Sequence, residues 1–182
     1  MSDARAPGSV VTIYTDGGAA PNPGPGAWAA LLMYRDSVRF ISGFDPHTTN
    51  NRMELLAAIS GLKALSRATA ADVFTDSKYL QDGISKWVHA WEQRNWRTAD
   101  KKPVLNRDLW MQLMEQAKNH QVAWKWVRGH SSNRYNHFVD LLAGATIANR
   151  KAFDRKMKRT ELDSLIDAAK ASRAHLNEIL SN

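Results

Sequence analysis

A β-rich run that ends in a carboxylate and two glycines constrains this chain more than any other stretch. Residues 10–14, Val-Val-Thr-Ile-Tyr, are β-branched or aromatic, which favours a strand. Thr15, Asp16, Gly17 and Gly18 follow at once. Because glycine leaves the backbone bare, a phosphate or a metal ion can approach Asp16 closely. An Asp-Gly pair is also typical of a hairpin, so this stretch alone leaves a functional and a structural interpretation open.

A second stretch repeats the pattern, since Phe-Thr-Asp at 74–76 matches Tyr-Thr-Asp at 14–16. Neighbouring strands would bring these two ends together. Glu54, at the start of an expected helix, can point at the same place, and Asp140 lies among apolar residues of the last expected helix. Converging carboxylates repel one another unless protons or cations neutralise them. Oxygen ligands without cysteine favour Mg²⁺ or Mn²⁺ over Zn²⁺. The alternative is four unrelated helix caps and ion-pair partners.

The order of the expected strands and helices predicts an α/β fold. The first three strands are joined by short connections, which predicts an antiparallel meander, and later strands alternate with helices. This pattern is typical of a mixed sheet, here five-stranded, with helices packed against it. A Pro- and Gly-rich turn is expected at 20–26. The expected strands are 10–14, 27–34, 38–44, 72–76 and 122–127, and helices are expected to open near Thr48 and to span 77–84, 87–96, 106–120 and 133–150.

Length and composition limit the class of protein. The 182 residues fit one domain, 1–150, followed by a C-terminal helical extension, 151–182. The formal net charge of +7 makes an acidic polymer the expected partner. There is no cysteine, which suits a reducing compartment. No signal core or membrane-spanning run is seen, so we expect a cytoplasmic protein without membrane contact.

The extension carries an apolar stripe that needs a partner surface. Thr160 is the expected N-cap of a helix from Glu161, with leucines and isoleucines largely on one face. An isolated helix of about 20 residues is marginal in water. We expect this helix to dock onto its own domain in a monomer, with a tail-mediated dimer as the alternative.

Five stretches together resemble the bacterial type 1 ribonuclease H family. They read YTDGGAAPNPGPGAW, TTNNRMELLAAI, FTDSKYLQDGI, WRTADKKPVLNRDLW and WVRGHSSNRYNHFVDLLA, and they run in the family's order between about 10 and 150. The resemblance implies a ribonuclease H-like fold and an endonuclease that hydrolyses the RNA strand of RNA–DNA hybrids. It also implies catalysis with two Mg²⁺ ions, with Mn²⁺ as a possible substitute. By position, the metal-binding catalytic carboxylates would be Asp16, Glu54, Asp76 and Asp140, and the mobile catalytic histidine would be His130.

The resemblance also implies contacts with the hybrid near the cut. Asn22, Asn50 and Lys78 match positions that contact the duplex, and Thr49 with Asn22 would seat a DNA phosphate. Discrimination against other duplexes needs groups that sense the 2′-hydroxyl and the minor groove. The family commonly has glutamine at Lys78, and lysine cannot accept a hydrogen bond from that hydroxyl. All four residues also suit turns and caps.

A basic, tryptophan-rich stretch at 86–107 matches the family's protruding handle. Basic residues there can grip phosphates, and tryptophans can line a groove against sugars. Glu92 and Gln93 stand where the family carries lysines, so we expect a handle of weakened charge. We also expect Trp87 to pack onto the body. The expected substrate-binding residues of the handle are Trp87, Arg94, Trp96, Arg97, Lys101 and Lys102.

Two other classes compete with this interpretation. A non-catalytic duplex-binding module would have lost at least one carboxylate, and all four are present. A DNA-cutting or strand-transfer enzyme of similar fold, such as an integrase, would not need the residues that sense the 2′-hydroxyl. His137 departs from the family pattern and is expected to be a surface helix residue.

Overall fold

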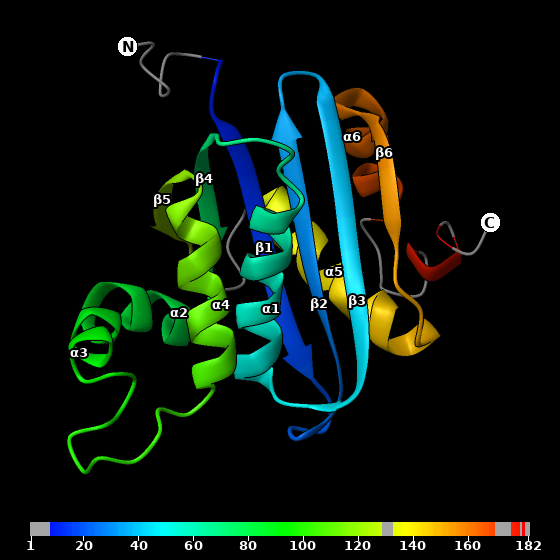
Figure 1. The fold of residues 1–182 in the computed structure, drawn as a ribbon. Coiled ribbons are helices and arrows are strands. Elements are labelled where there is room, and N and C mark those ends of the chain that lie inside the picture. Colours follow the sequence, from blue (N-terminus) through cyan, green and yellow to red (C-terminus); the bar gives the residue numbers. More distant parts are fainter. Residues whose placement is uncertain (1–7, 129–132, 170–175, 179, 181–182) are drawn as a thin grey trace.

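A six-stranded mixed sheet forms the centre of the computed structural model, which describes residues 8–128, 133–169, 176–178 and 180 (Figure 1). The strand order is β5-β4-β1-β2-β3-β6. β1, β2 and β3 form the predicted antiparallel meander, β4 and β5 run parallel to β1, and β6 is antiparallel to β3. The expected mixed α/β sheet is confirmed, with six strands rather than five. The strands are β1 (Val11–Ala19), β2 (Gly24–Tyr34), β3 (Ser37–Thr48), β4 (Ala70–Thr75), β5 (Gln121–Trp126) and β6 (Asp154–Lys158).

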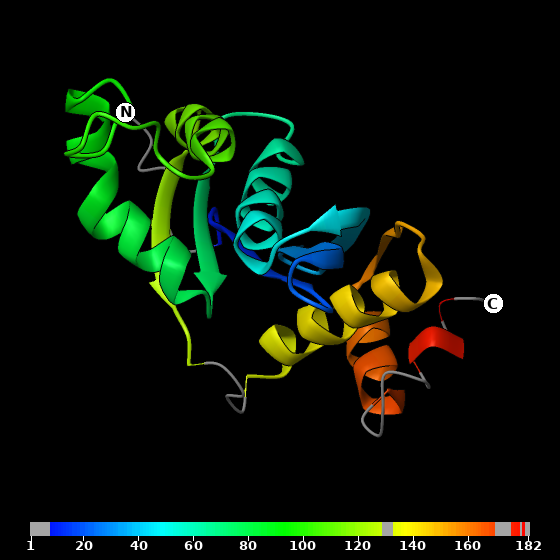
Figure 2. The ribbon, with the colours of Figure 1, turned by 90° about the horizontal axis from the view of Figure 1, so that it is seen from below.

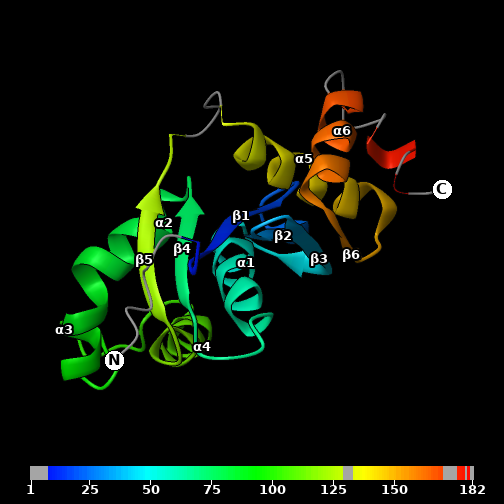
Figure 3. The ribbon, with the colours of Figure 1, turned by 90° about the horizontal axis from the view of Figure 1, so that it is seen from above.

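Helices cover both faces of the sheet. α1 (Asn50–Lys63) and α4 (Arg107–Lys118) lie on one face, and α5 (Arg134–Asn149) and α6 (Arg159–Ala168) lie on the other (Figures 2 and 3). Strand side chains alternate between the faces, so Ile13 joins the core under α1 and Tyr14 joins the core under α5. α1 lies close to β1 at Gly61. A Cβ added to this glycine would stand only 2.9 Å from the Cγ2 of Ile13. Each face therefore has its own apolar core.

The helices expected at 77–84 and 87–96 form one continuous helical segment that ends earlier. It consists of α2 (Lys78–Asp82), the π-helix η1 (Gly83–Trp87) and α3 (Val88–Gln93). A Cβ at Gly83 would overlap the Trp110 ring, so glycine lets this segment press against α4. Trp96 lies outside the helix, in left-handed backbone with φ of 57°.

The first strand is longer than its β-branched run. Asp16 was expected near the strand end, yet β1 continues to Ala19 because Gly18 and Ala19 still pair with Ala27 and Gly26 of β2. β2 correspondingly begins inside the expected 20–26 turn. Glycine and proline lower strand propensity, but the neighbouring strand overrides that preference here.

The C-terminal segment contains a strand, β6, before the expected helix, and the sequence did not predict this strand. β6 pairs with the edge of β3, and the Arg39 guanidinium donates to both Asp154 carboxylate oxygens at 2.8 and 2.7 Å. α6 begins at Arg159 rather than Glu161, and the Lys158 N–H donates to the Glu161 carboxylate at 2.6 Å.

The apolar side chains of this segment join the core under α5. Those buried there are Phe153, Leu162, Ile166, Ala169, Leu176 and Leu180. In this structure the extension therefore packs against the core of the same chain. Among the described residues, no helix is long and apolar enough to cross a membrane.

Candidate active site

The register of two parallel strands brings two aspartates together. β1 and β4 pair up to Tyr14 and Phe74, whose rings stack with centroids 4.8 Å apart. Asp16 and Asp76 each follow two residues later. Asp16 lies on β1 and Asp76 comes directly after β4, so both aspartates follow a paired position of two neighbouring strands. The matching tripeptides at 14–16 and 74–76 are therefore neighbours in space, as predicted.

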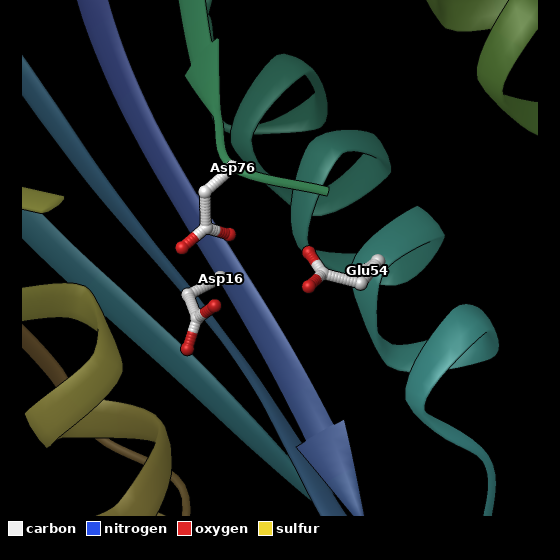
Figure 4. Close-up of side chains that lie close together, drawn as sticks. All are labelled: Asp16, Glu54 and Asp76. Carbon is white, nitrogen blue, oxygen red and sulfur yellow. The ribbon is translucent and has the colours of Figure 1, made fainter. Parts of the chain in front are cut away.

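Glu54 reaches the aspartates from the first turns of α1. Thr49 caps this helix, with its side chain accepting the Arg52 N–H at 3.3 Å. The Gly17 N–H donates to the Glu54 carboxylate. A Cβ on Gly17 would overlap the backbone of Met53 and Glu54, so glycine allows α1 to lie against β1. Figure 4 shows Glu54 directed from α1 toward Asp76 and Asp16.

The three carboxylates form a group that can hold a metal ion. One oxygen from each of Asp16, Glu54 and Asp76 lies within 4.8 Å of the others. Burial raises the pKa of Glu54 well above its usual value, and the charges of Asp16 and Asp76 raise it further. Its Oε2 is buried and has no hydrogen-bond partner in the part of the chain that the structure describes. A cation would neutralise this repulsion and satisfy that oxygen.

Asp140 is not one of this group and lies on α5. It is half-buried, between Val139 and Leu141 of the core under α5. One helical turn earlier, the Asn136 side-chain amide donates to Oδ2 of Asp76 at 3.5 Å. The first turns of α5 therefore approach the carboxylates. Sequence reasoning did not single out Asn136, although its position one turn before Asp140 was a usable signal.

The predicted catalytic histidine, His130, lies outside the described residues, so its role stays a prediction. The described chain resumes at Asn133, which caps α5 by accepting the N–H groups of Tyr135 and Asn136 at 3.0 and 3.1 Å. His137, the departure from the family pattern, is exposed on α5, as expected.

Three of the predicted substrate-binding residues join the β1–β2 turn to the start of α1. Oδ1 of Asn22 accepts the Asn50 N–H at 3.2 Å, and Oδ1 of Asn50 accepts the Ala19 N–H at 2.7 Å. Thr49 is the cap of the same helix. Asn22 and Asn50 are nevertheless exposed, so these residues shape the turn and also present polar groups to solvent.

Lys78 occupies the start of α2, two residues after Asp76. Its Nζ forms an ion pair with Asp82 at 3.1 Å, yet its side chain is 75% exposed. Such an exposed pair contributes little and leaves the ammonium accessible to a phosphate.

The handle tryptophans are mostly packing residues. Trp87, Trp91 and Trp96 follow one another in ring contact, with centroids 5.6 and 6.2 Å apart, and Trp91 also meets Trp110 of α4 at 5.6 Å. Trp96 is 8% exposed, so the substrate contact expected of it has little surface available. Trp87 is half-buried and packs on Tyr79, as expected.

The handle cations are exposed. Arg97 donates to the Lys101 carbonyl at 3.0 Å, which closes the loop between α3 and α4. The exposed basic side chains of this loop are Arg94, Arg97, Lys101 and Lys102. They can therefore face an anionic polymer.

A groove of about 690 Å³ lies at the other end of the sheet. It is lined by the start of β1, the β2–β3 hairpin, the end of α1 and β6, and by none of the clustered carboxylates. It is separate from the candidate active site.

Sequence comparison assigns the chain to a family. The family model described as RNase H matches residues 8–148. The chain belongs to the ribonuclease H family. A ribonuclease H of Granulibacter bethesdensis is 50% identical over 143 residues, which cover 79% of this chain and 95% of that protein. A ribonuclease H of Bradyrhizobium diazoefficiens is 52% identical over 134 residues, which cover 74% of this chain and 87% of that protein. The predicted resemblance to bacterial type 1 ribonucleases H is confirmed, and the chain is a hybrid-specific ribonuclease.

Solved structures agree with the ribonuclease H-like fold. LC9-RNase H1, a type 1 ribonuclease H with the type 2 active-site motif, has a TM-score of 0.76 and 27% identity, covering 92% of this chain and 84% of its own. LC11-RNase H1, solved in complex with RNA/DNA hybrid, has a TM-score of 0.56 and 19% identity, covering 77% of this chain and 98% of its own. At that identity, the second likeness shows the fold alone.

Proposed function

We propose that this ribonuclease H cuts the RNA strand of RNA–DNA hybrids by two-metal-ion hydrolysis at Asp16, Glu54, Asp76 and Asp140. The observation that carries the proposal is the group of Asp16, Glu54 and Asp76, whose ligand oxygens lie within 4.8 Å of one another. The buried, unpartnered Oε2 of Glu54 and the raised pKa of this residue fit a site built for a cation. An all-oxygen donor set suits Mg²⁺, with Mn²⁺ as the substitute.

Each side chain has a distinct task in this proposal. Bound Mg²⁺ supplies Lewis-acid activation of the attacking water and stabilisation of the leaving oxygen. Asp16 and Asp76 would hold the metal ions at the sheet, and Glu54 would add a ligand from α1. Asp140 would add a carboxylate from α5, where it follows Asn136 by one turn. His130 would shuttle protons during turnover or aid product release.

The hybrid would lie across the carboxylates, the β1–β2 turn and the handle. Asn22, Thr49 and Asn50 would contact the minor groove and a DNA phosphate, and Lys78 a further phosphate. Arg94, Arg97, Lys101 and Lys102 would grip the backbone, with Trp87 beside them. Membership of the ribonuclease H family, with relatives about 50% identical, supports this choice of partner.

The chain divides, in this proposal, into a catalytic domain at 1–150 and an extension at 151–182. The family match ends at residue 148, just before the boundary. Because the apolar side chains of the extension are buried in the chain's own core, a monomer is the proposed active form.

One assay tests the proposed function. Labelled RNA is supplied in an RNA–DNA hybrid, in double-stranded RNA and as a single strand, each with Mg²⁺ and with EDTA. We expect cleavage of the RNA in the hybrid with Mg²⁺ alone. Equal cleavage of the three substrates, or undiminished cleavage in EDTA, would contradict the proposal.

A further inference from the structure

The side-chain amide of Asn136 is buried, and only its nitrogen has a hydrogen-bond partner among the described residues. It lies in the first turn of α5 and is 4% exposed. Its Nδ2 donates to Oδ2 of Asp76 at 3.5 Å. Its Oδ1 is buried and has no partner among residues 8–128 and 133–169 or the described end of the chain. A buried acceptor without a donor is costly, so this oxygen indicates a missing partner.

A second buried acceptor without a partner lies beside the same aspartate. Oε2 of Glu54 shares this condition, and Glu54 belongs with Asp76 to the carboxylate group. Two such acceptors next to one carboxylate point to one kind of occupant, which is a cation together with its bound water. Hydrated Mg²⁺ supplies O–H donors in just such a place, because it usually keeps several waters.

Contacts of the N-cap residue Asn133 hold the start of α5, and with it Asn136, against the sheet. Oδ1 of Asn133 accepts the backbone N–H of Asn136, and Nδ2 of Asn133 donates to the Tyr14 hydroxyl at 3.4 Å. Tyr14 in turn stacks on Phe74, two residues before Asp76. The first turn of α5 is thus bonded to β1 and, through the Tyr14–Phe74 stack, contacts β4, which Asp76 follows.

An amide is the side chain that suits this position. A carboxylate here would add a negative charge beside Asp76, and a basic group would compete with the metal. An amide donates to Asp76 and still offers an acceptor, without changing the charge of the site.

We propose that Asn136 is a positioning residue of the metal site. Its Nδ2 orients the Asp76 carboxylate, and its Oδ1 accepts a hydrogen bond from metal-bound water. This inference rests on the proposed function. It adds a neutral residue from α5 to the site, and it connects the helix that carries Asp140 to Asp76, the aspartate that follows β4.

The test compares Asn136→Ala with Thr146→Val. Thr146 is also a buried polar residue of α5, but its hydroxyl is bonded to Ser42 and Leu142. The measurements are the Mg²⁺ concentration for half-maximal hybrid cleavage, KM for the hybrid, and the melting-temperature increase that Mg²⁺ causes without substrate. For Asn136→Ala we expect a half-maximal Mg²⁺ concentration raised about 10-fold or more, a smaller Mg²⁺-induced increase and an unchanged KM. Thr146→Val should lower the melting temperature and leave both Mg²⁺ responses unchanged.

A charged variant tests the contact with Asp76 independently of activity. Asn136→Asp should melt at a lower temperature than Asn136→Ala in EDTA, because it places a second carboxylate against Asp76. Equal melting temperatures of these two variants, or a wild-type Mg²⁺ response in Asn136→Ala, would overturn the positioning role. Failure of the wild type to cut hybrid would instead overturn the proposed function, and the Mg²⁺-induced stabilisation would still be measurable.

Discussion

The backbone N–H of Gly17 donates to the carboxylate of Glu54, so strand β1 directly holds the acid that α1 brings to the site. Any side chain at Gly17 would overlap the backbone of Met53 and Glu54. The glycine after Asp16 therefore serves the close approach of a helix. The sequence predicted that a ligand could approach the backbone after Asp16. In the structure the backbone of α1 occupies that position at Gly17.

Gly17→Ala should separate α1 from β1 and displace Glu54. We expect the variant to lose about 1–3 kcal/mol of unfolding free energy, as overpacked sites do, and to lose most of its kcat. Gly18→Ala is the matched control, because its Cβ would meet only Oδ1 of Asn50, at 3.8 Å. Chemical denaturation and hybrid-cleavage kinetics measure both effects, and equal behaviour of the two variants would contradict this account.

Glu54 should make the metal-free protein less stable as the pH rises. Its pKa in the folded protein lies well above the usual 4.5, so the folded state retains a proton that the unfolded state has lost. The stabilisation is complete below about pH 4.5 and decreases as the pH approaches the folded-state pKa. In EDTA, the melting temperature of Glu54→Gln should therefore fall less than that of the wild type as the pH rises above about 4.5. Parallel curves would show that Glu54 is not the responsible group.

Neutralising the handle should weaken binding of the hybrid and its dependence on salt. Each phosphate that the protein no longer neutralises lowers the slope of log affinity against log salt by roughly 0.7–0.9. The variant replaces four exposed cations with glutamine, and KM measured at several salt concentrations should be raised most at low salt. The four are Arg94, Arg97, Lys101 and Lys102.

A control for that variant removes the same charge elsewhere. It replaces four exposed cations that lie outside the handle, namely Arg35, Lys63, Lys118 and Lys151. We expect a smaller change in KM and in its salt slope. If the two sets behave alike, net charge rather than the handle determines affinity.

The C-terminal extension should stabilise the fold without taking part in the chemistry. Leu162→Ala removes a fully buried side chain from the core under α5, and such changes cost about 2–5 kcal/mol. Hybrid cleavage well below the melting transition should remain close to wild type. Leu105→Ala, at a leucine that is 75% exposed, should change stability little. A loss of kcat in Leu162→Ala with the fold intact would contradict this division of roles.

The sequence was informative where local pattern and register agree. The repeated Tyr-Thr-Asp and Phe-Thr-Asp predicted neighbouring strand ends, because residues that follow paired positions stay side by side. β6 was not predictable in this way, since Asp-Arg-Lys-Met-Lys has no β-branched residue and pairs only because β3 offers an open edge.

The site residues also differ in whether local sequence pattern or tertiary packing determines their place. Asp16, Glu54 and Asp76 were predictable as a group from their settings in the sequence. The contact of Asn136 with Asp76 was not, because it depends on how α5 crosses the sheet. The burial of Trp96 likewise depends on tertiary packing against Trp91, and a basic, aromatic stretch looks the same in sequence whether its tryptophans face solvent or core.

The most direct test of the shared-metal account is the effect of Asp16→Asn on cleavage and on stability in the same preparation. Asparagine keeps the size of the side chain and removes one of the three clustered charges. We predict that the rate of hybrid cleavage falls at least about 100-fold. This corresponds to a loss of about 2.7 kcal/mol of transition-state stabilisation. In EDTA, the melting temperature should be equal to or above that of the wild type, because one repulsion is relieved, and Mg²⁺ should raise it less. Full activity of a folded Asp16→Asn protein would contradict the account.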